Sequence, residues 1–241
     1  FQIIYRRISK NQLLVVALPP GTGGAFQFSP DGQSVAIVSP TTIRLMNMDG
    51  SGKENITNTK AVDWTYYAYK DVLYFVSDRD TCNRCFFLYS SNSKGSQVRR
   101  VSNLQLEDSW MGSRNNGAEM VVSARGKDFR FQLFRLNLKD GSYRRITHDT
   151  TASFTDPTFI QDGRQIAYRY KSNRRDRSLI AEIWVMDADG SNPKQLTYFP
   201  KSDTTAPWHA YHAGPPKWNA TNGWISSQSI SNGKYHLFAI T

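Results

Sequence analysis

The sequence has little of what membrane proteins and many enzymes need. No apolar run approaches the roughly 18 residues of a membrane-spanning helix, and no amphipathic run of helical length stands out. Two cysteines in 241 residues exclude a zinc site built from two cysteine pairs. No Gly-rich phosphate loop precedes a helix and no Gly-x-Ser-x-Gly elbow is present, so we expect any peptidase domain to lie outside this chain.

The chain also lacks an initiator methionine and a signal peptide. Residues 1–4 already have the composition of a strand, so we expect a mature or trimmed piece of a longer polypeptide. The net charge of +10 indicates either a solvated basic surface or an acidic partner, which could be a protein, a polysaccharide or a lipid surface. Nucleic acid is not expected, because no recognition helix or stacking motif accompanies the charge.

What the sequence does contain is a repeated pattern of short extended runs and tight turns. Residues 156–197 hold four such runs, with turns at Asp162-Gly163 and Asp189-Gly190. Asp-Gly suits hairpins because both turn positions tolerate positive φ. Four antiparallel strands in succession, with no helix between them, form a meander like that of a propeller blade.

The unit recurs in phase along the chain. Its last residues, Thr57, Ser102, Thr147 and Thr197, are separated by roughly one blade length. We therefore predict an all-β fold, a single β-propeller domain over residues 1–241, with six blades of four-stranded antiparallel sheets and incomplete terminal blades. The predicted repeats lie at approximately 26–57, 61–102, 109–147, 155–197 and 214–241, with a partial copy at 1–18.

Two segments carry a resemblance to a known family. Ser29-Pro30-Asp31-Gly32 and the run Met-Asp-Ala-Asp-Gly-Ser at 186–191 resemble the Pro-Asp repeat of TolB-type six-bladed β-propellers. The similarity covers about residues 26–241. It implies a periplasmic or other extracytoplasmic place in the bacterial envelope and a role in binding other proteins. Function does not follow from the fold, because propellers host many unrelated activities.

We expect the working surface to lie at the long connections between the second and third strands and between blades, because binding residues concentrate on variable loops held by a rigid scaffold. These connections carry much of the positive charge, either as scattered cations or as one basic arc that attracts an acidic protein partner. The candidate partner-binding residues are Arg84, Arg125, Lys127, Arg174, Arg175, Arg177, Trp208 and Tyr211.

Cys82 and Cys85 fall within one of these connections. No βαβ unit accompanies them, as a catalytic Cys-x-x-Cys would require, and Phe86 stands where haem attachment needs a histidine. The pair is either a small structural disulfide, which would indicate an oxidising compartment, or two free thiols.

Two further groups are candidate metal ligands. His209 and His212 lie in the longest connection, where they could bind a metal or belong to an aromatic loop that covers the channel mouth. Asp63, Asp108 and Asp156 begin three successive repeats. Their carboxylates could converge on a divalent cation at the channel mouth, or each could accept local hydrogen bonds. No other cofactor is expected.

Three functions are compatible with these features. The first is a non-catalytic extracytoplasmic propeller that scaffolds protein–protein contacts, as the TolB resemblance implies. The second is a propeller enzyme such as a metal-dependent polysaccharide lyase that uses the His209/His212 loop, since some TolB-type lyases of pectin fragments hold a metal with propeller histidines. The third is an accessory propeller of a larger peptidase or envelope-anchored protein.

Overall fold

The described part of the chain is built from β-strands, as the repeats predict. The computed structural model describes residues 2–7, 12–17, 26–28, 33–39, 42–69, 71–106, 111–114, 117–126, 130–172, 181–199, 212–231 and 234–240. Over these residues it contains no α-helix, and a 3-10 turn, Gln161–Gly163, follows one strand. None of the described segments is a helix that could cross a membrane. The all-β prediction is confirmed.

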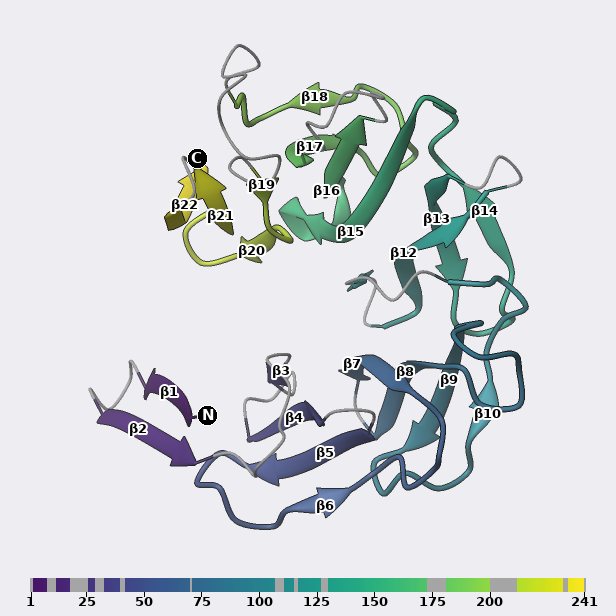
Figure 1. The fold of residues 1–241 in the computed structure, drawn as a ribbon, viewed down its shortest axis with the longest axis vertical. Helices are drawn as coiled ribbons and strands as arrows, with labels where there is room; N and C mark the ends of the chain where they lie inside the picture. The colour runs from purple at the N-terminus through teal and green to yellow at the C-terminus, as the bar shows by residue number, and fades with distance from the viewer. Residues whose placement is uncertain are drawn as a thin grey trace. The chain divides into compact units, whose positions relative to one another are not determined.

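Contacts divide the chain into two compact units, Phe1–Asn103 and Leu104–Thr241. The first unit contains a two-stranded sheet and two four-stranded antiparallel sheets, all ordered sequentially (Figure 1). The two-stranded sheet is β1 (Gln2–Arg7) and β2 (Gln12–Ala17). The four-stranded sheets are β3 (Phe26–Phe28), β4 (Ser34–Ser39), β5 (Thr42–Asn47) and β6 (Glu54–Asn55), then β7 (Asp63–Tyr69), β8 (Val72–Ser77), β9 (Phe87–Asn92) and β10 (Arg99–Arg100).

The second unit contains one four-stranded sheet and one eight-stranded sheet. The former is β11 (Gly112–Arg114), β12 (Glu119–Arg125), β13 (Phe131–Asn137) and β14 (Tyr143–Arg145). The latter begins with the meander β15 (Ala152–Ile160), β16 (Gln165–Ser172), β17 (Ala181–Asp187) and β18 (Lys194–Gln195). A short parallel bridge from β17 then joins it to β19 (His212–Ala213), β20 (Lys217–Asn219), β21 (Trp224–Ser231) and β22 (Lys234–Ile240).

The repeated sequence signature corresponds to a repeated set of hydrogen bonds. In the Asp-Gly-Ser turns at Asp49, Asp140 and Asp189, the aspartate accepts the backbone N–H of the following serine at 2.9 Å and its hydroxyl at 2.6 Å. In the three repeats that end in threonine, that residue accepts a backbone N–H from the third strand, fourteen residues earlier. These bonds are Ile43 to Thr57 at 2.8 Å, Leu133 to Thr147 at 2.9 Å and Ile183 to Thr197 at 2.8 Å.

Glycines in these turns let neighbouring sheets approach closely within each unit. Gly190, at φ 101°, lies against the backbone carbonyl of Ile146, which follows the outer strand of the preceding sheet. Gly95, at φ 74°, lies against the carbonyl of Ile56 in the same way. A Cβ atom at either glycine would overlap that carbonyl oxygen, so the turn must be glycine for the sheets to pack.

The cores lie between successive sheets. In the first unit, a cluster that includes Ile43, Ile56, Leu73 and Phe75 joins the β3–β6 and β7–β10 sheets. In the second, the β11–β14 sheet contributes Val121, Leu133 and Ile146 to a larger cluster. The other members of this cluster come from β15, β16, β17 and the residue that follows β17: Ala152, Phe154, Phe159, Ile166, Tyr168, Met186 and Ala188. Sheets packed face to face in this way hold the turns and connections at their ends in place.

Candidate functional site

A disulfide joins Cys82 to Cys85 in the connection between β8 and β9, which confirms the predicted pairing. The Asp78 carboxylate holds the same connection by accepting the backbone N–H groups of Val62 at 2.8 Å and of Arg84 at 2.9 Å. Arg84 is exposed, with φ of 60°, and its guanidinium lies 5.8 Å from the centre of the Phe86 ring. The connection is therefore an ordered loop that presents a cation.

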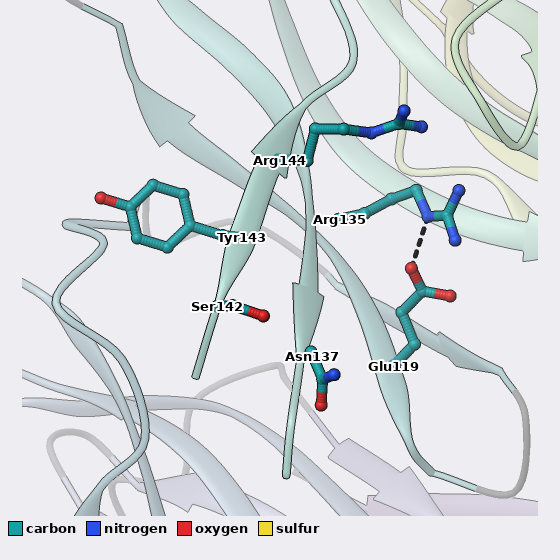
Figure 2. Close-up of a pocket in the computed structure, with 6 residues that line it drawn as sticks. All are labelled: Glu119, Arg135, Asn137, Ser142, Tyr143 and Arg144. Carbon is teal, nitrogen blue, oxygen red and sulfur yellow. Dashed lines mark hydrogen bonds and ion pairs between the residues drawn. The ribbon is translucent and has the colours of Figure 1, made fainter. Parts of the chain in front are cut away.

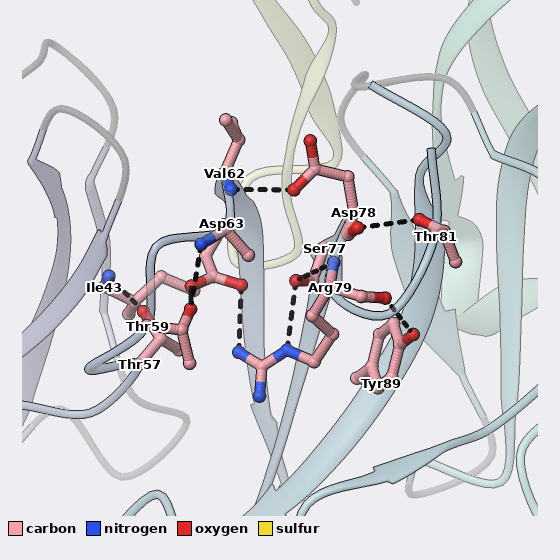
Figure 3. A network of polar contacts seen from close by, with 11 residues as sticks. Ile43, Thr57, Thr59, Val62, Asp63, Ser77, Asp78, Arg79, Thr81 and Tyr89 are labelled. Atoms are coloured by element: carbon pink, nitrogen blue, oxygen red, sulfur yellow. Dashed lines mark hydrogen bonds and ion pairs between the residues drawn. The ribbon is translucent and has the colours of Figure 1, made fainter. Parts of the chain in front are cut away.

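Asp63 lies beside this loop in a buried polar network (Figure 3). Its side chain is fully buried and forms an ion pair of 3.0 Å with Nη2 of Arg79. The Arg79 guanidinium also donates to the Ser77 hydroxyl at 3.0 Å and lies 4.7 Å from the centre of the Phe75 ring. The Tyr89 hydroxyl donates to the Arg79 carbonyl at 2.7 Å, and burial, above all, raises the pKa of Tyr89.

Asp156 is the corresponding predicted ligand in the second unit. It lies at an irregularity in the β15–β16 pairing, 4% exposed and with φ of 53°. Arg169 donates from Nε to its carboxylate at 2.6 Å and from Nη1 to the Ala213 carbonyl at 3.2 Å. Although part of Lys217 is exposed, burial of its ammonium lowers the pKa to about 8, and the nearby Asp156 opposes this shift.

The predicted metal ligands are thus only partly described. Asp63 and Asp156 each pair with an arginine, while Asp108 and His209 lie outside the described residues. The backbone of His212 belongs to β19, and its side chain is not described. Within the described ranges, no group of three or more His, Cys, Asp or Glu side chains could hold a metal. A metal site at these positions stays a prediction.

Of the predicted partner-binding residues, two are described. Arg84 occupies the disulfide loop, and Arg125 ends β12, exposed, with its guanidinium 5.5 Å from the centre of the Phe131 ring. Both lie at connections between the second and third strands of their sheets. The remaining candidates, Lys127, Arg174, Arg175, Arg177, Trp208 and Tyr211, lie outside the described residues.

A pocket that sequence reasoning missed lies in the second unit, at the turn end of the β11–β14 sheet. It encloses about 400 Å³ and is lined by Glu119, Arg135, Asn137, Ser142, Tyr143 and Arg144 (Figure 2). Arg135 and Arg144 point to the same side as the Glu119 carboxylate, while Tyr143 points to the other side of the strand. The available signal was the symmetric placement of Arg135 and Arg144 about the loop of residues 138–141, which puts them opposite each other.

Glu119 anchors the inner wall of this pocket. Arg135 donates from Nε to one carboxylate oxygen, and Arg114 donates from Nε to the other at 2.7 Å. Burial acts to raise the pKa of Glu119, but the hydrogen bonds and charges of the two arginines together outweigh it and hold the pKa below its ordinary value. Arg114 is further fixed by the Gly163 carbonyl and by the Phe159 ring, 4.7 Å away. Glu119 is therefore ionised at neutral pH.

Comparison with solved structures identifies the class of fold first: sequential antiparallel sheets of this kind are found in β-propellers. The chain superposes on a putative TolB from Agrobacterium tumefaciens with a TM-score of 0.75 and 18% identity, covering 99% of this chain and 83% of that one. TolB from Acinetobacter baumannii superposes with a TM-score of 0.65 and 16% identity, and the match covers 100% of this chain and 59% of that one. The fold is thus that of a TolB-like propeller, and the expected resemblance is confirmed.

Enzymes share the same architecture. An oligogalacturonate lyase from Vibrio parahaemolyticus superposes with a TM-score of 0.67 and 11% identity, covering 100% of this chain and 69% of that one. No protein-family model matches the sequence, and no curated protein does.

Proposed function

We propose that the chain is a non-catalytic, extracytoplasmic β-propeller module that binds an acidic protein partner within the bacterial envelope, through connections between the second and third strands of its sheets. The observation that carries the proposal is the loop at 78–85. A disulfide and the Asp78 carboxylate fix it, and it presents an exposed Arg84. An ordered loop loses little conformational entropy on binding, which leaves more of the contact energy as affinity.

Three further features support this function. The net charge of +10 attracts an acidic surface over distances longer than a contact. Arg125 is exposed at the equivalent connection of another sheet. The disulfide favours an oxidising compartment, in line with the envelope location that the TolB resemblance implies.

The test is charge reversal at these loops, measured on the rate of association with a partner isolated from the native envelope. We expect Arg84→Glu and Arg125→Glu to slow association, and the wild-type rate to fall as salt rises, because exposed charges at an interface act mainly on the on-rate. Folding should be preserved, since an exposed loop substitution usually costs less than about 0.5 kcal/mol.

Lys53→Glu and Lys139→Glu are the matched controls. Both lysines are exposed near tight turns, at the opposite strand ends of their own sheets from the second-to-third-strand connections. Equal slowing by the loop and turn variants, or no slowing by either, would show that these loops are not the contact surface.

A second candidate, a metal-dependent polysaccharide lyase, is favoured by the fold's similarity to an oligogalacturonate lyase solved with manganese, at a TM-score of 0.64 and 14% identity. His209 and His212 would be the ligands. Incubation of the purified protein with oligogalacturonate and Mn²⁺, beside His209→Ala, separates the two functions. Cleavage by the wild type that the variant lacks would establish the lyase, and no cleavage by either would favour the binding module.

In the binding reading, the chain could also serve as the accessory propeller of a larger peptidase or envelope-anchored protein.

A further inference from the structure

The pocket of Figure 2 is shaped by a pair of like charges. Arg144 on β14 lies directly opposite Arg135 on β13 in the strand register. Directly opposed side chains on one sheet face have Cβ atoms about 5 Å apart, and like charges so placed are destabilising. In two other sheets, the residue one before the end of the outer strand faces an uncharged residue. Arg99 faces Ser90, and Lys194 faces Val185. The paired arginines are thus a property of this sheet and not of the repeat.

Among the described residues that line the pocket, Glu119 is the one carboxylate, and it does not neutralise this pair. One oxygen of Glu119 is bonded to Arg135 and the other to Arg114, which lies outside the pocket lining. The side chain of Arg144 makes no hydrogen bond or ion pair within the described part of the chain. Hydrogen bonds from Ser191 are the leading cause of the lowered pKa of Asp189, on the next sheet, and the charge of Arg144 adds to it at longer range.

The guanidinium of Arg135 points to the same side as that of Arg144 and bonds to Glu119 through Nε. Its two terminal nitrogens have no partner among the described residues. Two guanidinium groups on one side of a pocket, with N–H donors that no described residue accepts, form a site for an anion. A planar carboxylate matches the fork geometry of arginine.

The edge of the sheet adds a second recognition element. β14 is the outer strand, and within the described residues it pairs only with β13. Asn137 donates its N–H to the Ser142 carbonyl, so hydrogen bonding alternates and the N–H and C=O of Tyr143 face outward. The Tyr143 ring is about half exposed and lies edge-on to Phe134, with ring centres 6.0 Å apart. An outward backbone beside an exposed aromatic ring suits an extended peptide.

We infer that this pocket binds an acidic, extended peptide segment, with one side-chain carboxylate held between Arg135 and Arg144 and the peptide backbone along the edge of β14. Charge complementarity selects an anion, and the exposed strand edge favours a peptide over an oligosaccharide. The pocket lies at the Glu119 end of β12, whereas Arg125 lies at the other end. The site is therefore separate from the Arg125 connection, and it makes no use of the loops of the proposed function.

The experiment measures binding of a fluorescent six-residue glutamate peptide, blocked at both ends so that its side chains carry the only carboxylates. Fluorescence anisotropy is recorded with the full chain at low salt and again at about 0.15 M salt. The Arg144→Gln variant removes a guanidinium that makes no hydrogen bond or ion pair among the described residues, so its folding should be unchanged. We expect it to weaken binding about tenfold, the value of one charge-assisted hydrogen-bonded contact.

Arg99→Gln is the matched control. Arg99 is an exposed arginine at the equivalent position of an outer strand in the first unit, and its loss changes the net charge by the same amount. We expect binding by Arg99→Gln to equal that of the wild type. A glutamine peptide of the same length should bind more weakly than the glutamate peptide, since it lacks the carboxylates.

Three results would overturn the inference. Equal weakening by Arg144→Gln and Arg99→Gln would show diffuse attraction to a basic surface. Binding of a uronic-acid oligosaccharide without binding of the peptide would assign the pocket to a carbohydrate. Failure of the glutamate peptide to bind the wild type at low salt would show that no acidic peptide occupies it. The loop variants Arg84→Glu and Arg125→Glu, measured with the same peptide, should bind normally, which separates this site from the loops.

Discussion

At the scale of single residues, buried arginine–carboxylate pairs stand where the sequence suggested metal ligands. Asp63 is fully buried against Arg79, and Asp156 is nearly so against Arg169. Such pairs contribute little net stability over an apolar replacement, but leaving one partner alone in the interior is costly. Their hydrogen bonds fix the position of the groups around them, which here include Arg79 at the start of the disulfide loop.

Asp63→Asn should therefore destabilise the protein strongly. It leaves the Arg79 guanidinium buried without a counter-charge, at a cost of about 3–5 kcal/mol in the free energy of unfolding. Urea denaturation measures this cost, with the exposed Asp71→Asn as control. The double variant Asp63→Asn/Arg79→Met should recover much of the loss, because it removes the stranded charge. A loss no larger than that of Asp71→Asn would mean that the ion pair does not hold this region.

Glu119 gives the protein a pH dependence whose sign follows from its pKa. The two arginines hold that pKa below the ordinary value of 4.5, so the folded state binds the proton less readily than the unfolded state does. The contribution of Glu119 to stability is present above the unfolded pKa and is lost as the pH falls through the folded one. We expect the wild type to lose more stability than Glu119→Gln as the pH is lowered below 4.5, measured by denaturation at each pH. Parallel curves would contradict this origin of the acid sensitivity.

At the scale of elements, the Asp189-Gly190 turn does two things. Asp189 organises the turn itself, and Gly190 receives the carbonyl of the preceding sheet. The second role depends on the neighbouring sheet and can be tested separately from the first.

Gly190→Ala should be far more destabilising than Gly223→Ala. Both glycines have positive φ, 101° and 70°, so alanine is strained at either one by about 1 kcal/mol. Only at Gly190 would the new Cβ atom also overlap the Ile146 carbonyl, whereas Gly223 has open space around it. The difference between the two losses in thermal denaturation isolates the contact between the sheets. Equal losses would show that the sheets can separate to accept a methyl group.

The repeats were predictable from sequence because their signals are local. The Asp-Gly turns and the closing threonine or serine of each repeat recur at spacings that the sequence shows directly. The disulfide was predictable for the same reason. The pairing of Asp63 with Arg79 and of Asp156 with Arg169 was not foreseen, because it depends on which way a side chain turns at the end of a strand. The pocket was missed because Arg144 looks like ordinary surface charge until the register places it opposite Arg135.

At the scale of the whole molecule, one fold accommodates binding proteins and enzymes, so the architecture alone does not select a function. A resident metal would distinguish a metal-dependent lyase from a binding module. A metal that binds only the folded state raises the free energy of unfolding, so its presence can be measured. The blade count of six stays a prediction that both functions share.

Metal removal is the corresponding measurement. For a non-catalytic module, we expect dialysis against EDTA to leave the thermal midpoint of the full chain unchanged, and added Mn²⁺ to have no effect. A bound metal at a hundred times its dissociation constant would add about 2.7 kcal/mol to the free energy of unfolding. A midpoint that rises with Mn²⁺ in the wild type, and not in His209→Ala, would support the lyase.

The contact between a turn glycine and a backbone carbonyl has a further consequence for how such a chain can evolve. Gly95 against Ile56 and Gly190 against Ile146 join successive sheets through a turn glycine and a main-chain carbonyl, and every repeat possesses that carbonyl whatever its side chains. A duplicated repeat that keeps the glycine would therefore carry this contact with it. Gene duplication or loss then has to refit only the side chains of the core between the sheets, while the side chains at the strand ends remain open to selection for new ligands.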